Sequence, residues 1–186
     1  GLATPMSIMV GVGAGACAGV LIKNAEALER MEKIDTLVID KTGTLTEGKP
    51  AVVGIETAQG FEENEILRLA ASVERGSEHP LAAAIVAHAA SRGVKPTEVV
   101  DFDSPTGKGV IGLVEGRKVA LGNTKFLAEL GVDTQALAQR AETARSDGAT
   151  AIFIAIDGKV AGIFAVADPI KQTTPAALKA LIEEGI

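Results

Sequence analysis

A seven-residue string, DKTGTLT at residues 40–46, carries the clearest chemistry in the sequence. It follows a short apolar run at residues 36–39, whose branched side chains are typical of a buried parallel strand. An aspartate at the carboxyl end of such a strand lies where open α/β sheets bind ligands, so Asp40 could attack phosphorus and form an acyl phosphate. Gly43 would let backbone N–H groups converge on phosphate oxygens. Lys41 and the threonine hydroxyls would add charge and hydrogen bonds.

A second group of candidate residues lies in the middle of the chain. Glu74 and His79 bracket a loop that leads into a helix opened by Pro80. Gly107 and Gly109 precede an expected strand. Each has a structural alternative, because a lone histidine is often structural and turns use glycine constantly.

Two further segments allow two interpretations each. Gly122 and Asn123 end an expected hairpin, and Asn123 could either face a ligand or cap the helix that follows. Asp168 and Lys171 lie in the string DPIK, which fits a capped turn before a helix as well as it fits a binding segment. Residue type and spacing alone do not decide between these interpretations.

The rest of the pattern predicts an α/β protein with an inserted module. The turns at residues 115–117 and at Asp157-Gly158 are typical of β-hairpins. We expect strands at 51–55, 110–114, 118–121, 151–156 and 159–166, and helices at 23–33, 62–72, 80–92, from Asp133 toward 148, and from about 174 to 185. This order indicates an antiparallel α+β module inserted into a doubly wound domain with only one or two of its strands.

Composition excludes several classes of function. Lys and Arg number 18 against 24 Asp and Glu, which argues against nucleic acid as a partner. Aromatic residues make up 3%, with no Trp or Tyr, so stacking platforms for bases or sugars are not expected. A single cysteine, Cys17, allows no disulfide within the chain and favours a reducing, cytosolic environment.

Residues 1–22 contain no charged side chain and match a membrane span in length. Pro5 and the high glycine content favour the end of a span cut from a longer protein over a signal peptide, which would begin with a positively charged region. This segment could also pack on a neighbour and mediate oligomerisation.

These strings resemble a known family. DKTGTLT is similar to the phosphorylation motif of P-type ATPases, and GLATPMSIMVGVG, GVLIKNAEALE and SEHPLAAAIV resemble the heavy-metal branch, most closely its copper-exporting members. The resemblance runs through essentially all 186 residues but covers only a central piece of a pump. It implies a partial haloacid-dehalogenase-like (Rossmann-type) phosphorylation domain, with an inserted α+β nucleotide-binding domain built on an antiparallel sheet flanked by helices.

The resemblance also implies roles for the site residues. Asp40 would be the autophosphorylated nucleophile, with Lys41 and Thr42 beside it in the catalytic motif. Mg²⁺ would be held by Asp40, by the Thr42 carbonyl and by an aspartate beyond residue 186. Glu74 would accept from the adenine amino group and His79 would orient the nucleotide. The remaining ATP-binding positions implied are Gly107, Gly109, Gly122, Asn123, Asp168 and Lys171.

Four segments follow from the resemblance. Residues 1–22 would be the apolar end of a membrane span, 23–48 a helix and the start of the phosphorylation domain, 49–165 the nucleotide-binding domain, and 166–186 the return into the phosphorylation domain. The whole protein would be a membrane pump with this region in the cytoplasm, joined to transmembrane and actuator domains. It would use ATP and Mg²⁺ to export a heavy-metal ion, with Cu⁺ the expected cargo, bound outside this chain and not by Cys17.

Two alternatives remain open at this point. A soluble phosphatase of the haloacid dehalogenase type would share the aspartate nucleophile, but it usually places a second aspartate two residues on, where this chain has Thr42. Alternatively, the 186-residue chain by itself binds nucleotide and catalyses no turnover, since its later Mg²⁺ ligand and most of the phosphorylation sheet would lie outside it.

Overall fold

The computed structural model describes residues 3–31 and 33–186. The chain divides into two units. One, here called the sheet unit, comprises Asp40–Lys171, and the other, the terminal unit, comprises Gly1–Ile39 with Gln172–Ile186.

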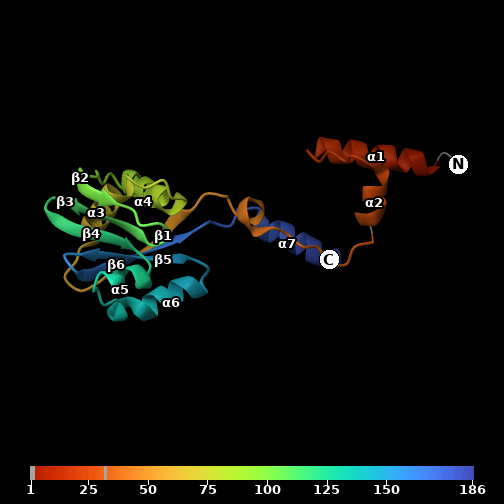
Figure 1. Ribbon diagram of the computed structural model, residues 1–186. Coiled ribbons are helices and arrows are strands. Elements are labelled where there is room, and N and C mark those ends of the chain that lie inside the picture. The colour runs from red at the N-terminus through yellow and green to blue at the C-terminus, as the bar shows by residue number, and fades with distance from the viewer. Residues whose placement is uncertain (1–2, 32) are drawn as a thin grey trace. The chain divides into compact units, whose positions relative to one another are not determined.

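An antiparallel sheet of six strands forms the centre of the sheet unit (Figure 1). The spatial order is β1-β6-β5-β4-β3-β2. The strands are β1 (Ala51–Thr57), β2 (Val99–Asp103), β3 (Gly109–Val114), β4 (Arg117–Gly122), β5 (Thr150–Ile156) and β6 (Lys159–Ala167). The turns of the β3–β4 and β5–β6 hairpins have positive φ at Glu115-Gly116 and Asp157-Gly158. Such tight turns match the strand twist, and both predicted hairpins are confirmed.

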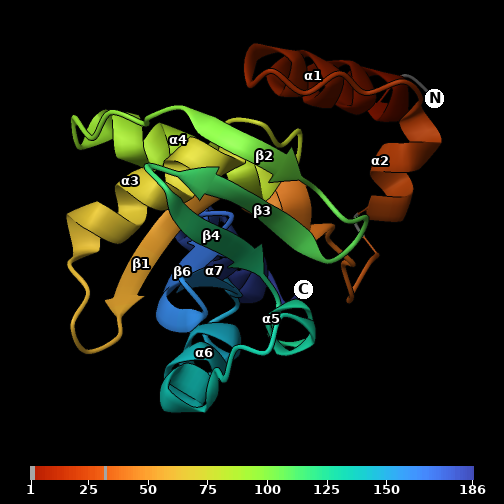
Figure 2. The same cartoon turned by 60° about the vertical axis from the view of Figure 1, so that its left-hand side comes forward.

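Helices cover both faces of the sheet (Figures 1 and 2). On one face lie α3 (Glu63–Glu74) and α4 (Pro80–Ser91), and on the other lie α5 (Thr124–Glu129), the short 3₁₀ turn η2 (Gln135–Leu137) and α6 (Ala138–Ser146). Strand β5 supplies both cores by simple alternation. Ile152, Ile154 and Ile156 pack in the cluster with α3 and α4, whereas Ala151, Phe153 and Ala155 pack in the cluster with α5 and α6.

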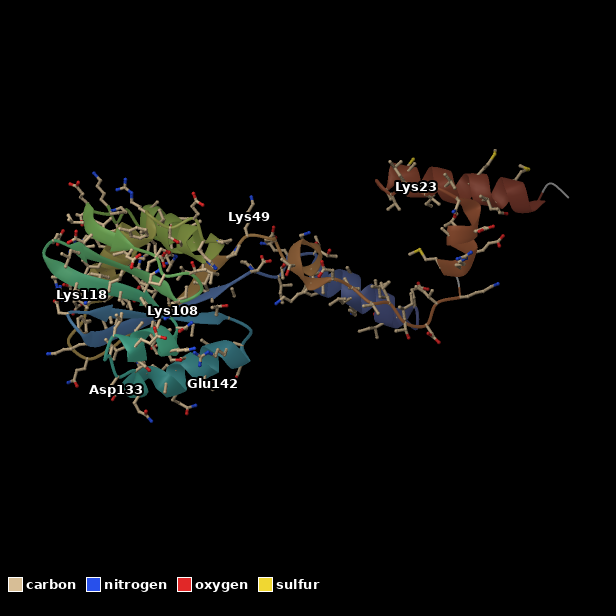
Figure 3. The ribbon with its side chains drawn as sticks, viewed as in Figure 1. Lys23, Lys49, Lys108, Lys118, Asp133 and Glu142 are labelled. Carbon is tan, nitrogen blue, oxygen red and sulfur yellow. The ribbon has the colours of Figure 1, made fainter. Side chains whose placement is uncertain are left out.

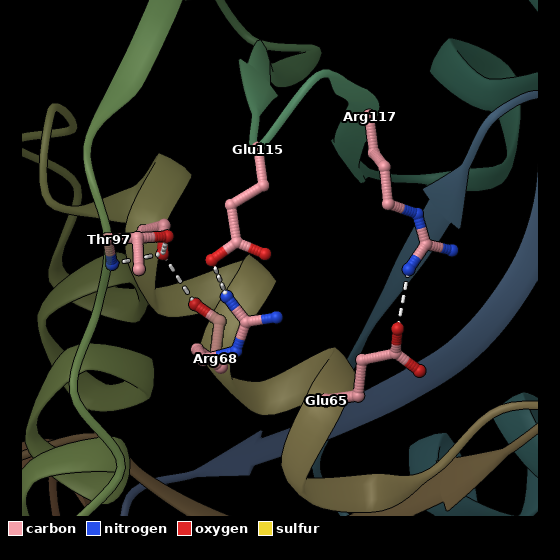
Figure 4. A network of polar contacts seen from close by, with 6 residues as sticks. Glu65, Arg68, Thr97, Glu115 and Arg117 are labelled. Atoms are coloured by element: carbon pink, nitrogen blue, oxygen red, sulfur yellow. Dashed lines mark hydrogen bonds and ion pairs between the residues drawn. The ribbon is translucent and has the colours of Figure 1, made fainter.

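Polar contacts join α3 to the β3–β4 hairpin and to the loop before β2 (Figure 4). Arg68 on α3 pairs with Glu115 in the β3–β4 turn, and Arg117 donates to Glu65 at 2.5 Å. In the last turn of α3, the Ser72 hydroxyl donates to the Arg68 carbonyl at 2.7 Å and accepts from the Thr97 N–H at 2.9 Å. The Ser72 contacts lie in the last turn of α3, which also carries Glu74.

The described residues of the terminal unit form three helices: α1 (Ala3–Cys17), α2 (Ala25–Met31) and α7 (Thr174–Glu183). The last begins after Thr173 with Pro175 in its first turn and ends before Gly185, whose φ is +86°, as the sequence predicted. Within residues 3–31 and 33–186, no helix combines the length and the apolar character needed to cross a membrane.

The strand expected at residues 36–39 is not formed. These residues have no regular secondary structure, and Val38 is 92% exposed. A parallel strand is stable only when neighbouring strands satisfy its N–H and C=O groups, and among the described residues no strand pairs with this segment. The apolar pattern therefore predicted a strand that the structure does not contain.

Candidate functional site

One cavity of about 280 Å³ brings together six of the predicted site residues. They come from the end of α3, the start of α4, the loop before β3 and the end of β4: Glu74, His79, Gly107, Gly109, Gly122 and Asn123. The other lining residues are Ser77, Leu81, Ala82, Ser104, Pro105, Lys108, Val110, Leu121, Thr150, Ala151 and Ile152. Predicted site residues as far apart in sequence as Glu74 and Asn123 thus line one hollow.

Glu74 is the buried acid of this cavity, with 7% of its surface exposed. Burial raises the pKa of Glu74 from its ordinary value of 4.5 to about 7, because the charged form loses its hydration, while a hydrogen bond with Ser77 acts in the opposite direction. Close to neutral pH the group can therefore exchange between an accepting carboxylate and a donating carboxylic acid.

His79 has a structural role that the sequence did not reveal. It occupies the N-cap position of α4, and its Nδ1 accepts a hydrogen bond from the Leu81 N–H at 3.2 Å. An accepting Nδ1 carries no proton, so the neutral ring has its proton on Nε2. Helix capping and ligand contact are therefore compatible in this exposed imidazole, since they use different ring nitrogens.

The two roles of His79 can be separated by substitution. We expect His79→Asn to keep most of the stability, because asparagine is a good N-cap, and His79→Ala to cost about 1 kcal/mol. Both variants should weaken nucleotide binding, because both lose Nε2. Urea unfolding and ATP titration of the two variants make the comparison. Equal ATP affinity in wild type and His79→Asn would contradict a ligand role.

The three glycines of the cavity are required for different structural reasons. Gly107 has a φ of +71° and no atom within 4 Å of the position that a Cβ would take, so it serves the turn before β3. Gly109 and Gly122 are directly paired across β3 and β4. A Cβ at either position would lie 2.7 Å from the Phe126 ring, so these two glycines allow Phe126 of α5 to pack on the strands.

Asn123 caps the helix that follows it, one of the two roles that the sequence allowed. Its side-chain oxygen accepts from the Phe126 N–H at 2.9 Å and begins α5. The residue also lines the cavity. Both interpretations considered for it remain compatible with the structure.

Asp40 lies in a separate region, the Asp40 loop, defined here as residues 40–49. Residues 41–45 form a single irregular turn with Gly43 at a φ of +77°, and Asp40 is exposed. Asp40, Lys41 and Thr42 do not line the cavity with Glu74. The structure thus places the predicted nucleophile and the predicted base-binding residues on different parts of the sheet unit.

Asp168 and Lys171 join the Asp40 loop to the segment after β6. Asp168 accepts from the Thr46 hydroxyl at 2.5 Å and from the Lys49 N–H at 3.1 Å. The Lys171 ammonium donates to the Gly43 carbonyl at 2.7 Å. Thr46, 3% exposed, also accepts from the Gly43 N–H at 3.0 Å. Asp168 and Lys171 therefore contact the loop and not the cavity lined by Glu74.

Thr46 is a structurally important residue that sequence reasoning missed, because its partner lies 122 positions away. We expect Thr46→Val to cost about 1–3 kcal/mol, since valine leaves the Gly43 N–H and the Asp168 carboxylate without this partner. Amide hydrogen exchange at Gly43 should accelerate. The matched control is Thr44→Val in the same loop, where the side chain is exposed and the change should stay within about 0.5 kcal/mol. Equal effects of the two substitutions would contradict this role.

A larger cavity, of about 530 Å³, lies beside β1, β6 and α6. Asp168 is its sole predicted site residue among those described, and its lining includes Arg140, Glu56 and Asp147. The smaller cavity is the better candidate site, because the predicted binding residues converge there.

The described residues offer few metal ligands. Among them, no group of three or more His, Cys, Asp or Glu side chains could hold a metal ion. The exposed Asp40 carboxylate and the neighbouring carbonyls are hard oxygen donors of the kind that suits Mg²⁺. A magnesium ion there would need further ligands from phosphate and water.

Comparison with known proteins fits this geometry. Residues 34–186 match the model of the haloacid dehalogenase-like hydrolases. Over all 186 residues the chain is 57% identical to a copper-transporting P-type ATPase of Rhizobium leguminosarum bv. viciae and 54% identical to a silver exporting P-type ATPase of Salmonella typhimurium. It spans only 22% and 23% of the length of these relatives.

Solved structures give the same result. A zinc-transporting PIB-type ATPase in its E2.Pi state superposes with a TM-score of 0.87 at 34% identity, over 98% of this chain and 29% of that one. The catalytic domain of the CPx-ATPase CopB-B gives 0.64 at 30% identity, over 89% and 56%. The N-domain of HMA8, a copper-transporting P-type ATPase, gives 0.55 at 28% identity, over 63% and 99%.

The chain therefore belongs to the haloacid dehalogenase-like hydrolase family. Its relatives within that family are heavy-metal P-type ATPases, as the motifs indicated, and this supports the pump over the soluble phosphatase. The α/β fold class, with an antiparallel sheet flanked by helices, is likewise confirmed.

Proposed function

We propose that this chain is the ATP-binding and phosphorylation-site portion of a heavy-metal exporter whose cargo is Cu⁺. The observation that carries the proposal is the convergence of Glu74, His79 and the two paired glycines, Gly109 and Gly122, on one cavity. Copper or silver is the cargo named for three relatives that are 57%, 54% and 54% identical to this chain. The cargo ligands would lie outside the residues of this chain.

The cavity has the chemistry to select adenine. Glu74 is buried at its wall and can accept from an exocyclic amine when ionised. His79 presents Nε2–H, because Nδ1 is engaged with the backbone of α4. Gly109 and Gly122 line the cavity with backbone alone, because Phe126 packs where their side chains would lie. A purine with an amino group suits both Glu74 and His79.

Asp40 would receive the phosphoryl group. One carboxylate oxygen attacks the γ-phosphorus of ATP, the bond from that phosphorus to the β–γ bridging oxygen breaks, and ADP leaves while an acyl phosphate remains. Thr42 stands where phosphatases of this family usually have a second aspartate, so no general acid and base is available there to hydrolyse the product quickly. A long-lived acyl phosphate is what a transport cycle requires.

Magnesium would assist at the same place. Asp40 and the Thr42 carbonyl would be its protein ligands from this chain, and the ion would neutralise charge that develops on the transferred phosphoryl group. Because Lys171 binds the Gly43 carbonyl, its charge also lies next to this loop.

The parent protein would be a membrane pump with this region on the cytoplasmic side, acting with its transmembrane and actuator domains. By itself the chain would bind nucleotide without turnover. Residues 1–22 would belong to the membrane part of the parent or contribute to self-association.

Phosphorylation of the full-length exporter tests the proposal. Membranes containing the wild-type protein should form an acid-stable phosphoenzyme with γ-labelled ATP, and Asp40→Asn should form none. Asp35→Asn, an exposed acid five residues earlier, is the matched control and should label normally. Label that persists in Asp40→Asn would refute the assignment of the nucleophile.

A further inference from the structure

The cavity has an uneven distribution of charge. Glu74 lies at the C-terminal end of α3, where the helix dipole contributes partial negative charge. Phosphates would be repelled from this side, whereas a neutral base would not. Among the described residues that line the cavity, Lys108 is the only lysine or arginine.

The N-terminus of α4, which borders the cavity, has no free N–H groups for phosphates in its first turn. Pro80 has no N–H, and the Leu81 N–H is occupied by the Nδ1 atom of His79. The next two amides, of Ala82 and Ala83, donate to the His79 carbonyl at 2.9 and 3.2 Å. The first turn of α4 is therefore saturated by its own cap, and phosphate recognition must come from elsewhere.

The size of the cavity also indicates that the phosphates bind outside it. At about 280 Å³ it lies just below the range of roughly 300–1,000 Å³ usual for ligand pockets. It can take a base and its sugar, so a triphosphate chain would extend to the mouth. Lys108 is exposed, which suits a residue at the mouth. Figure 3 labels it within the sheet unit.

The ammonium group of Lys108 is already paired. Its Nζ lies 2.5 Å from Glu129 at the end of α5, and the two side chains are 46% and 40% exposed. An exposed pair of this kind is weak, so a phosphate can replace the carboxylate at little cost. The backbone of Lys108 is fixed, because its N–H donates to Pro105 and Gly109 pairs with Gly122.

We propose that Lys108 is the polyphosphate-binding residue of the cavity and sets its preference for ATP over adenosine, and that Glu129 holds the Lys108 ammonium group when no nucleotide is bound. This inference rests on the proposed function, since it assumes that the base and sugar occupy the cavity. Glu129 then acts as a built-in competitor: ATP binding must displace it, and adenosine binding need not.

Calorimetric titration of the 186-residue chain with ATP and with adenosine tests the inference. We expect Lys108→Gln to weaken ATP binding about tenfold, the usual scale for one charge-assisted contact, and to leave adenosine affinity unchanged. Glu129→Gln should strengthen ATP binding about two- to threefold, because the competitor is gone, again without an effect on adenosine. Lys125→Gln, an exposed lysine of α5 outside the cavity, should change neither affinity.

The outcomes separate the two proposals. Wild-type chain that binds neither ligand would overturn the proposed function and this inference with it. Wild-type binding with an unchanged ATP affinity in Lys108→Gln would overturn the inference alone. An equal loss of ATP and adenosine affinity in Lys108→Gln would also overturn it, since Lys108 would then support the cavity and not the phosphates.

Discussion

Gly109→Ala is expected to lower the free energy of unfolding of the sheet unit by about 3 kcal/mol. A Cβ at this position would lie 2.1 Å from the Leu121 carbonyl oxygen and 2.7 Å from Cδ1 of Phe126. Neither atom can move freely, because the first belongs to the backbone of β4 and the second to a buried ring. Strand β4 would have to separate from β3, so the cavity wall would be lost together with stability.

Gly107→Ala is the matched control for this prediction. No atom lies within 4 Å of a Cβ at that position, and only its φ of +71° opposes alanine, at a cost of about 1 kcal/mol. Urea unfolding of both variants measures the difference. A similar cost at the two positions would mean that steric exclusion by β4 and Phe126 is not what requires glycine at 109.

Glu74→Gln is expected to change how stability depends on pH. In the unfolded chain Glu74 titrates near its ordinary pKa of 4.5, whereas burial in the folded protein raises this pKa to about 7. Between these values the native state binds more protons than the unfolded state, so stability falls as pH rises. The shift corresponds to about 3 kcal/mol, lost in full once the pH exceeds the folded-state pKa.

The variant removes this titration because glutamine does not ionise. From about pH 4 to about pH 8, the stability of Glu74→Gln relative to wild type should therefore increase by about 3 kcal/mol. Glu78→Gln, an exposed acid four residues on, should show no comparable trend. Denaturant unfolding across this pH range provides the measurement, and a constant difference between Glu74→Gln and wild type would contradict the burial effect.

Local patterns predicted much of the sheet unit. The hairpin turns contain Gly116, Asp157 and Gly158, residue types that tolerate positive φ, and both formed where expected. Helices α3 and α4 follow from their apolar spacing and from Pro80. Strand β2 was not predicted, because an edge strand that pairs only with β3 and carries Asp101 and Asp103 lacks a clear alternating pattern.

The site could likewise be predicted only in part, because several of its features depend on contacts between residues far apart in the sequence. Glu74 and His79 could be selected by their strings, but their burial and capping depend on α3, α4 and the sheet together. Thr46 could not be found at all, since its role comes from a hydrogen bond to Asp168 across the whole inserted module. At residues 36–39 the sequence predicted a strand that is absent from the structure. An apolar run does not reveal whether partner strands are present.

ATP binding in the cavity lined by Glu74, His79 and Gly109 is the central claim. An NMR titration of the 186-residue chain with ATP tests it most directly. We expect saturable shifts of the backbone amides of His79, Gly109 and Gly122, with the amides of α6 unaffected. An absence of shifts at millimolar ATP, or shifts confined to residues 40–49, would contradict it.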